Sequence, residues 1–506
     1  MKKLLSLILC IALMLCMLIS CSSDNAPEQS SSIEESSNEE SSDTEESSSD
    51  ESTSEDSSSV EEEVHEHLDI TGYTVVIPTE CDLSTKYAAE NLVNLVKDTL
   101  SIELSIVTDD VPEAEREFLI GETNREESKT DTPLADKQYL LFKENEKIVM
   151  KGYGIYVGAA CGDFINKFTY ECGGVLDIQD LPSAEVALDF EFATEYKNAI
   201  LMIGDGMGET HIKMAEKNGL DAFVARSFSS VGESVTRSQS VLNGEASYTD
   251  SAAGGTAMST GYKTLNKYVG LDKNGNFIRN VRELAYLNGA KTAVITTDVI
   301  TGATPSSFIC HNNSRENTEQ LQAQINEVIA SQTIDYIAGD VGDELINHTK
   351  TALSKISENG SQFFIMIEEG QIDKASHSKD KNGAIKYVIR FNDAIAYAAQ
   401  FTLCHPDTVL IVTADHETGG LEQAKKLPNY FYFTSWEHTN VDVPLFALGS
   451  GTEIFNDVKT ENINIGKFCA AAYSDDPFGQ QTPVEPVNPI EPTEPAEPDE
   501  PAETVE

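Results

Sequence analysis

The sequence is poor in basic residues and lacks the marks of several protein classes. Its 506 residues include 35 Lys and Arg against 85 Asp and Glu, so the formal net charge is −50 at pH 7. Nucleic-acid binding depends on Lys and Arg, and it is therefore not expected here. The nine cysteines are too sparse for a disulfide scaffold, and none has the spacing of zinc ligands. An apolar content of 40% nevertheless supports a real core, in two or three domains.

The N-terminus has the pattern of an export signal. Lys2 and Lys3 precede an apolar run over residues 4–19, which is short for a membrane span and typical of a signal segment. The run ends in Leu-Ile-Ser-Cys at residues 18–21, which resembles the bacterial lipoprotein cleavage box. The resemblance implies a lipid on Cys21 and an extracytoplasmic location on the bacterial cell membrane. An ordinary signal peptide with a chance cysteine is the alternative.

Two acidic segments of low complexity flank the rest of the chain. Residues 22–64 hold 16 Asp and Glu, and residues 475–506 hold another 10 together with eight of the 17 prolines. Like charges and few apolar side chains keep such segments extended and solvated. We predict a disordered spacer at 22–64, a disordered tail at 475–506, and two folded regions between them, at 65–195 and 196–474.

Residues 65–195 have the pattern of a small α/β domain. Its expected elements are strands at 73–77, 102–107 and 118–121, a helix at 88–100, a hairpin at 139–150 and a closing helix at 154–168. This order loosely resembles the small α/β domain that precedes the barrel in some glycoside hydrolases. The resemblance implies a spacer or a module that contacts carbohydrate or cell wall.

Residues 196–474 alternate apolar runs with helical patterns, which indicates a largely parallel sheet between helices. The apolar runs lie at 199–203, 293–296, 363–367 and 409–412. Each is followed at once by polar residues of types that bind ligands. Because ligands collect at the carboxyl ends of parallel strands, we expect the functional site at that edge of the sheet.

Carboxylates and histidines follow three of these runs. Asp205 ends the first run between two glycines, which leave room for a metal ion, although alone it could be a turn residue. Glu368 ends the third run. Asp373 and His377 come after it, four residues apart and so on one helical face, which suits zinc ligands as well as a plain surface pair.

The fourth run leads into Asp415 and His416, which can both reach a metal ion if the chain turns at Gly419 and Gly420. His438 stands alone, shortly before a further strand-like run at 443–447. By itself it is an ordinary polar residue. Its place near a strand makes it a candidate for the same edge of the sheet.

A candidate nucleophile and a candidate phosphate clamp complete the pattern. Ser251 stands where a helix is expected to begin, and the positive potential there favours an alkoxide and an incoming anion. A plain helix cap by Asp250 and Ser251 is the alternative. The hydroxyl of Thr304 suits magnesium, and Arg315 offers two parallel bonds to phosphate unless it is a surface cation.

Together these motifs resemble the alkaline phosphatase family over residues 198 to 474. The motifs are Asp-Gly-Met-Gly at 205–208, Asp-Ser-Ala at 250–252, Ala-Thr-Pro at 303–305 with Arg315, Glu-x4-Asp-x3-His at 368–377, Thr-Ala-Asp-His-Glu-Thr-Gly-Gly at 413–420 and Glu-His-Thr at 437–439. The resemblance implies an α/β fold and a metal-dependent phosphomonoesterase. It implies Ser251 as the nucleophile of a phosphoserine intermediate and Arg315 as the holder of two phosphoryl oxygens.

The resemblance also implies two zinc ions and one magnesium ion. It places one zinc on Asp373, His377 and His438, the second on Asp205, Asp415, His416 and Ser251, and magnesium near Asp205, Thr304 and Glu368. Two departures stand out. Gly302 occupies the position where better-known members have Asp or His, so the magnesium site of this chain has one side chain fewer than theirs. Only 17 residues separate Gly420 from His438, so the family's crown insertion is absent or very short.

Two other functions fit parts of the pattern. A phosphodiesterase of the same superfamily usually lacks the arginine clamp, so Arg315 favours monoesters, whose dianion gains more from a bidentate cation. A non-catalytic surface protein would bind carbohydrate through residues 65–195, and its phosphatase-like part would be expected to have lost a metal ligand.

Overall fold

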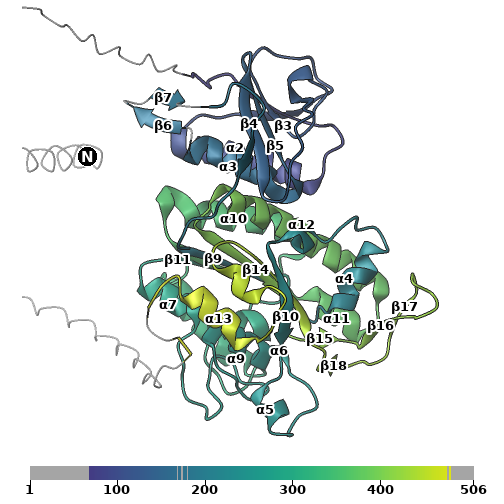
Figure 1. The fold of residues 1–506 in the computed structure, drawn as a ribbon. Coiled ribbons are helices and arrows are strands. Elements are labelled where there is room, and N and C mark those ends of the chain that lie inside the picture. Colours follow the sequence, from purple (N-terminus) through teal and green to yellow (C-terminus); the bar gives the residue numbers. More distant parts are fainter. Residues whose placement is uncertain (1–67, 168, 173–174, 179–180, 476–477, 480–506) are drawn as a thin grey trace, which may run out of the picture. The chain divides into compact units, whose positions relative to one another are not determined.

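The computed structural model describes residues 68–475 and 478–479, except for 168, 173–174 and 179–180 (Figure 1). Contacts divide the chain into two units, Met1–Glu63 and Val64–Glu506, and all described residues belong to the second. Cys21, the spacer and nearly all of the tail lie outside the described residues, so what is predicted for them stays a prediction. Within the described part, no helix has the length and apolar character needed to span a bilayer.

The N-terminal part of the second unit forms a mixed six-stranded sheet with the order β2-β1-β3-β5-β4-β8. The first four of these strands are parallel, and β4 runs antiparallel to both β5 and β8. The predicted hairpin is thus confirmed as β4 and β5. The strands are β1 (Thr74–Ile77), β2 (Ser105–Thr108), β3 (Glu117–Ile120), β4 (Gln138–Glu144), β5 (Lys147–Gly152) and β8 (Ala187–Asp189), with β6 (Thr169–Cys172) and β7 (Val175–Ile178) in a separate pair.

Two helices pack on this sheet, α2 (Leu83–Leu100) and α3 (Val157–Asn166). Helix α2 begins five residues before the expected start. The carboxylate of Asp82 accepts the N–H of Thr85 at 2.7 Å and so caps the first turn. Apolar periodicity alone did not reveal this start, because the first turn of the helix is largely polar.

The same two helices contact the long helix α12 (Lys381–Cys404) of the larger sheet region. The hydroxyl of Tyr87 donates to Asp393 at 2.5 Å, and the amide of Gln400 donates to the carbonyl of Ile155 at 3.1 Å. The predicted boundary between residues 195 and 196 falls between the two sheets and stays a prediction.

Residues 198–461 form an eight-stranded sheet with the order β12-β11-β13-β9-β14-β19-β10-β20. Strands β12 to β14 in this order are parallel, and β19 is antiparallel to its neighbours β14 and β10, so the predicted, largely parallel sheet is confirmed. The strands are β9 (Asn198–Gly204), β10 (Ser230–Val235), β11 (Lys291–Thr296), β12 (Tyr336–Ala338), β13 (Phe363–Glu369), β14 (Thr408–Thr413), β19 (Val443–Leu448) and β20 (Lys459–Glu461).

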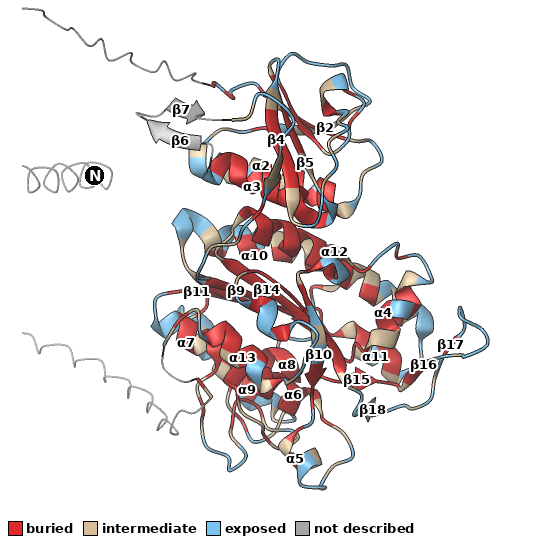
Figure 2. Cartoon of the chain, in the orientation of Figure 1, coloured by how far each residue is buried: buried red, intermediate tan, exposed pale blue. Residues whose placement is uncertain are grey.

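Both faces of this sheet are buried (Figure 2). Along β9, Ile200 and Met202 belong to one hydrophobic cluster, whereas Leu201 and Ile203 belong to another on the opposite face. This explains why the strand is apolar throughout. The remaining helices are α4 (Glu209–Glu216), α5 (Gln239–Leu242), α6 (Ser251–Thr260), α7 (Val281–Leu287), α8 (Ala303–Ser307), α9 (Thr318–Ala330), α10 (Leu345–Ser357), α11 (Gln371–His377) and α13 (Ile463–Ala470).

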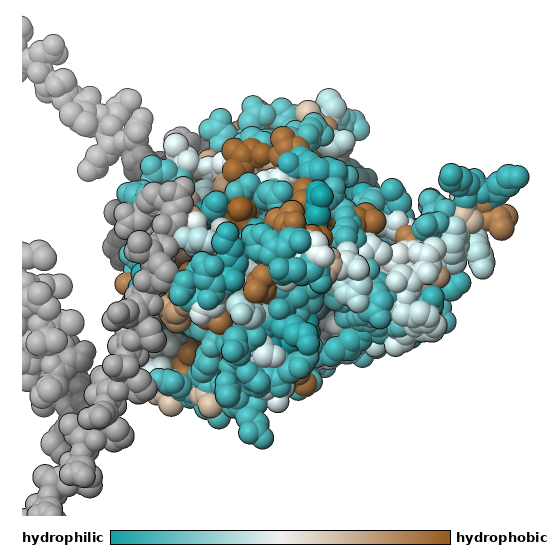
Figure 3. All heavy atoms as spheres, turned by 90° about the horizontal axis from the view of Figure 1, so that it is seen from below, coloured by the Kyte–Doolittle hydropathy of each residue, from teal (hydrophilic) through white to brown (hydrophobic). Residues whose placement is uncertain are grey.

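Two short strand pairs lie beyond the sheet, β15 (Glu417–Thr418) with β18 (His438–Thr439) and β16 (Leu421–Gln423) with β17 (Phe431–Phe433). The face of the molecule in Figure 3 is mostly hydrophilic, with hydrophobic residues in small separate patches. Five cysteines of the described part are free thiols, namely Cys81, Cys161, Cys310, Cys404 and Cys469.

Candidate metal centre

Four neighbouring strands of the large sheet end side by side, and each leads into polar residues. In the order β11, β13, β9 and β14, these are Asp298, Glu368, Asp205 and the pair Asp415–His416. From one strand to the next these residues lie 47 or more positions apart in the sequence, yet they meet at one edge, as expected for the carboxyl ends of parallel strands.

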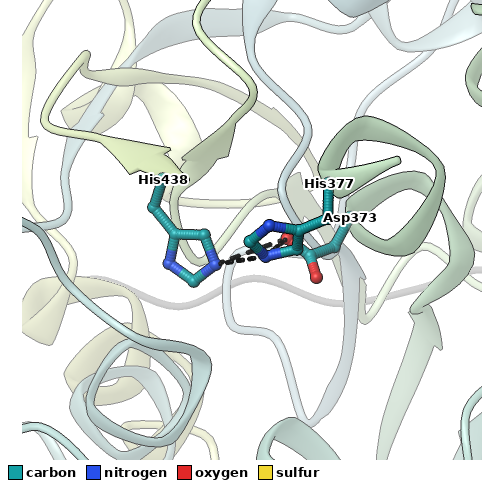
Figure 4. A group of neighbouring side chains, drawn as sticks. All are labelled: Asp373, His377 and His438. Atoms are coloured by element: carbon teal, nitrogen blue, oxygen red, sulfur yellow. Dashed lines mark hydrogen bonds and ion pairs between the residues drawn. The ribbon is translucent and has the colours of Figure 1, made fainter. Parts of the chain in front are cut away.

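The first group of candidate ligands consists of Asp373, His377 and His438 (Figure 4). The two imidazole Nε2 atoms are 3.0 Å apart, and Asp373 Oδ1 lies 3.4 Å from His377 Nε2 and 3.5 Å from His438 Nε2. Helix α11 places Asp373 and His377 on one face, four residues apart, and β15 pairs with β18 to bring His438 opposite them.

The partners of the other ring nitrogens assign the tautomers of these two histidines. His377 Nδ1 lies 2.5 Å from the carbonyl oxygen of Trp436, and His438 Nδ1 lies 2.7 Å from that of Thr249. A carbonyl can only accept, so each Nδ1 carries the proton and each Nε2 of the neutral ring presents a lone pair. Two lone pairs and a carboxylate then face one another, which is an arrangement that a cation fits.

The second group consists of Asp205, Asp415 and His416, all buried. His416 Nε2 lies 3.2 Å from Asp415 Oδ2 and 3.6 Å from Asp205 Oδ1. Within the described part of the chain, these two carboxylate oxygens have no hydrogen-bond partner although both are fully buried. Buried polar atoms are normally satisfied, so these orphaned oxygens fit metal ligands.

Burial also shifts the protonation of this second group. It raises the pKa of Asp205 well above its usual value, and the charges of Asp415 and Asp373 raise it further. Burial likewise raises the pKa of Asp415, and it lowers the pKa of His416 well below the usual range. The imidazole is therefore neutral at physiological pH, the state that binds metal, and the carboxylates need a compensating cation to stay ionised.

A buried threonine connects the two groups. The hydroxyl of Thr418 donates to Asp373 Oδ1 at 2.5 Å and lies 3.2 Å from His416 Nδ1. Since that hydroxyl proton is committed to the carboxylate, its oxygen accepts from Nδ1–H of His416. All three histidines of the centre thus present Nε2 to the site and have Nδ1 held by an acceptor.

An oxygen-rich corner lies beside the second group, around Glu368 and Thr304. Burial raises the pKa of Glu368 to about 8, while a hydrogen bond from the hydroxyl of Thr296 opposes this shift. The hydroxyl of Thr304 lies close enough to lower that pKa, yet it has no hydrogen-bond partner within the described residues. A carboxylate and an orphaned hydroxyl are the hard oxygen ligands that magnesium prefers.

The candidate nucleophile sits at the start of helix α6. Asp250 caps that helix by accepting the N–H of Ala253 at 3.0 Å, and Ser251 is its first residue. The Ser251 hydroxyl lies 3.2 Å from His416 Nε2 and so donates to it in the metal-free chain. Arg315 Nη1 lies 3.5 Å from Asp250 Oδ2, which holds this half-buried guanidinium beside Ser251.

Gly206 allows the elements of the centre to approach one another. Its φ of +73° lies in the left-handed region, and an added Cβ would lie 2.8 Å from Thr418 Oγ1 and 3.0 Å from Cα of Asp373. Its N–H donates to Asp415 Oδ1 at 3.1 Å. The glycine that follows Asp205 is thus needed for close packing as well as for the turn.

Apart from Cys21, which lies outside the described residues, the structure gathers the candidate residues named from the sequence at this centre, and it adds some that the motifs did not reveal. Thr418 stands inside the predicted Asp415–Gly420 motif, and its position next to two ligands is the only sequence signal for its role. Trp436 and Thr249 act through their backbone carbonyls, which every residue has, so no residue type in the sequence marks these two positions. Asp298 directly follows a predicted strand, which is the pattern used to find the other acids.

Comparisons with known proteins agree with this geometry. The family described as "Alkaline phosphatase" matches residues 196–347 and 340–435. The chain is 36% identical to alkaline phosphatase H of Pseudomonas aeruginosa (strain UCBPP-PA14), over 44% of this chain and 69% of that protein. It is 30% identical to alkaline phosphatase 4 of Bacillus subtilis (strain 168), over 45% of this chain and 62% of that protein. The chain thus spans less than two thirds of the Bacillus protein's length.

A solved alkaline phosphatase from the Antarctic bacterium TAB5 has a similar fold, with a TM-score of 0.50 and 27% identity over 55% of this chain and 98% of that one. A variant of that enzyme, in which one histidine is replaced by glutamate, is described with magnesium bound in its M3 site.

Proposed function

The chain belongs to the alkaline phosphatase family, and on this premise we propose that it hydrolyses phosphate monoesters with Ser251 as the nucleophile. The single observation that carries the proposal is the common orientation of His377, His416 and His438. Each presents a bare Nε2 to one centre while its Nδ1 is held by an acceptor. This pattern is typical of ligating histidines, and the Nε2 of one of them, His416, lies 3.2 Å from the hydroxyl of Ser251.

The two groups of ligands fit two zinc ions, and the oxygen-rich corner fits one magnesium ion. Zinc accepts imidazole nitrogen and carboxylate oxygen, which are the ligand types of both groups. Bound metal ions supply positive charge for the ionised serine oxygen, the phosphoryl oxygens and the leaving oxygen. The residues that would hold them are Asp373, His377 and His438 in the first group, Asp205, Asp415, His416 and Ser251 in the second, and Asp205, Thr304 and Glu368 in the corner.

The residues of the chain then divide the reaction between them. The Ser251 oxygen attacks phosphorus, an Oγ–P bond forms, and the ester oxygen leaves as the alcohol. Water hydrolyses the phosphoserine and restores the hydroxyl. Two parallel N–H groups of Arg315 hold two phosphoryl oxygens, and the N-terminus of α6 adds positive potential at the attacked group. A monoester dianion gains more from these cations than a diester monoanion does, which supports monoesters as substrates.

The test uses the full chain with zinc and magnesium, a chromogenic phosphate monoester and the matching diester, from neutral to alkaline pH. We expect zinc-dependent hydrolysis that favours the monoester. In Ser251→Ala it should fall by more than about 10³-fold while zinc stays bound. Ser259→Ala is the matched control, because this serine lies in the same helix and its hydroxyl bonds only the carbonyl of Thr256 within the part of the chain that the structure describes.

Acid quenching during turnover should trap a phosphate on the peptide that carries Ser251, detectable by mass spectrometry. Faster hydrolysis of the diester would replace the proposal with a phosphodiesterase. No hydrolysis of either ester by folded, zinc-loaded protein would instead favour a non-catalytic surface protein, and glycan binding would then be the property to measure.

The predicted location belongs to the same proposal. A lipid on Cys21 would hold the enzyme outside the cytoplasmic membrane, with the acidic spacer at 22–64 between membrane and catalytic part. Incorporation of a labelled fatty acid into the full chain, and its loss in Cys21→Ser, would support this. A secreted, unlabelled wild-type chain would point to an ordinary signal peptide. Contact of residues 65–195 with carbohydrate or cell wall stays a prediction.

A further inference from the structure

We propose that Asp298 is a magnesium ligand of this centre and takes the place of the side chain that Gly302 lacks. The inference rests on the proposed function, because the magnesium ion belongs to the same centre. It concerns a residue outside all the motifs that identified the site. Four observations carry it: the position of the carboxylate, its free oxygen, its alignment with Glu368 and the orphaned hydroxyl of Thr304.

The Asp298 carboxylate fills the space beside Gly302. A Cβ added to Gly302 would lie 2.9 Å from Asp298 Oδ2 and 3.3 Å from its Cγ. The backbone of Gly302 has a φ of −55°, which any residue adopts, so conformational strain does not require glycine there. Two atoms crowd a side chain at this position, the Asp298 carboxylate oxygen and the backbone carbonyl oxygen of Val299, each 2.9 Å from the added Cβ.

Only one oxygen of this carboxylate is engaged. Asp298 Oδ1 accepts the N–H of Val299 at 2.7 Å and pairs with the ammonium of Lys374. Oδ2 accepts no hydrogen bond from the described part of the chain, although the side chain is largely buried. A carboxylate with one oxygen anchored and the other free is held ready to bind a cation.

Asp298 and Glu368 are aligned by a shared threonine. The N–H of Asp298 donates to the Thr296 hydroxyl at 2.8 Å, and that hydroxyl donates to Glu368 Oε2. Both side chains flank Gly370, where an added Cβ would lie 3.0 Å from Cβ of Asp298 and 3.6 Å from Cδ of Glu368. Two carboxylates held this close repel each other unless a cation lies between them.

The buried hydroxyl of Thr304 provides an independent sign of a ligand. It is 1% exposed and has no hydrogen-bond partner within the described residues. The Thr304 hydroxyl and the carboxylates of Glu368 and Asp298 all offer oxygen, without nitrogen or sulfur. Magnesium requires such oxygen ligands, and it completes an octahedral shell with water.

The test measures magnesium binding directly, by calorimetric titration of the zinc-loaded full chain and by elemental analysis after dialysis. We expect Asp298→Ala and Asp298→Asn to weaken magnesium affinity by at least about tenfold while zinc content and thermal unfolding stay close to wild type. Wild-type protein that binds no magnesium would overturn the proposal, and so would unchanged affinity in both variants. Neither result would bear on zinc-dependent hydrolysis, which is assayed separately.

Moving the carboxylate provides a reciprocal test. Gly302→Asp in the wild-type background should crowd Asp298 and should not strengthen magnesium binding. The same change in Asp298→Ala should raise magnesium affinity above that of Asp298→Ala alone, because the carboxylate oxygen at 2.9 Å is gone and only the Val299 carbonyl oxygen, at the same distance, has to give way. If the double variant binds magnesium no better than Asp298→Ala, the proposed exchange of positions is wrong.

Lys374→Ala separates a metal ligand from a mere ion-pair partner. Removing the ammonium leaves the Asp298 carboxylate in place and takes a positive charge away, so magnesium affinity should stay the same or rise. A loss equal to that of Asp298→Ala would show that Asp298 acts only through its pair with Lys374, and would overturn its assignment as a ligand.

Discussion

The imidazole rings of His416 and His438 stack with their centroids 3.6 Å apart and their planes at 19°. One ring belongs to each group of metal ligands, so the two groups share a border. This close approach also lowers the pKa of His416, beyond the effect of its burial. The stack places the two groups of ligands next to each other, so the sites that motif spacing presents as separate form one candidate two-metal centre.

Replacing His438 is expected to cost the first group its metal ion. In His438→Ala, the zinc content of the dialysed protein should fall from two ions per chain toward one. The kcat/KM for a monoester should drop by more than about 100-fold, which is more than the loss of a residue that only hydrogen-bonds a metal ligand would cause. Elemental analysis and steady-state kinetics measure both. His348→Ala is the control, because among the described residues that ring bonds only the Tyr336 hydroxyl, at 2.7 Å. Unchanged zinc content in His438→Ala would contradict the assignment.

Much of the centre could be predicted from the sequence because its ligands follow recognisable strands. The apolar runs at 199–203 and 409–412 are buried on both faces, and such runs predict neighbouring parallel strands whose carboxyl ends meet. Asp205, Asp415 and His416 follow directly. Helical spacing predicts the shared face of Asp373 and His377 in the same way.

Other parts depend on contacts that no local pattern encodes. Asp298 neighbours Glu368 only because β11 pairs with β13, and strand order cannot be read from either run. The tautomer of His377 is set by a backbone carbonyl of Trp436, a group that every residue has. The early start of α2 at Leu83 depends on the cap by Asp82, which periodicity overlooks.

The hydroxyl of Thr418 is expected to tune both groups of ligands. Thr418→Val keeps the shape but removes the donor to Asp373 and the acceptor for His416 Nδ1. Zinc affinity should fall by about 10–100-fold, the usual cost of losing an outer partner of a ligand. Competition with a zinc chelator measures this. Thr402→Val is the control, since that hydroxyl bonds only Ala398 of its own helix. Equal affinities in the two variants would show that Thr418 has no such role.

Arg315 should act on the phosphoryl group and not on the metals. Arg315→Ala is expected to lower kcat/KM for a monoester by roughly 10–100-fold, as suits charged hydrogen bonds of about 1.5–3 kcal/mol. Inhibition by inorganic phosphate should weaken in parallel, with zinc content unchanged. Lys267→Ala is the matched control, because this exposed cation accepts the N–H of Arg315 with its backbone carbonyl and pairs its side chain with Glu316. A comparable loss in Lys267→Ala would indicate general attraction by positive charge in place of a specific clamp.

Removing the metal ions should make stability depend on pH. Burial raises the pKa of Glu368 from 4.5 to about 8, so between these values the folded chain holds a proton that the unfolded chain releases. The unfolded state then binds fewer protons, and the free energy of unfolding falls as pH rises, by about 1.4 kcal/mol per pH unit for one such group. Asp205 and Asp415 shift in the same direction.

Urea unfolding of the metal-stripped chain from pH 5 to pH 9 measures this dependence. The free energy of unfolding should decline through this pH range and level off above about pH 8. In Glu368→Gln, the slope of that free energy against pH should be smaller by the contribution of about one proton. With zinc and magnesium bound the carboxylates stay ionised, so the decline should disappear. A metal-stripped chain whose stability does not change across the window would mean that these carboxylates are not held protonated by burial. The centre would then need no cation to compensate them.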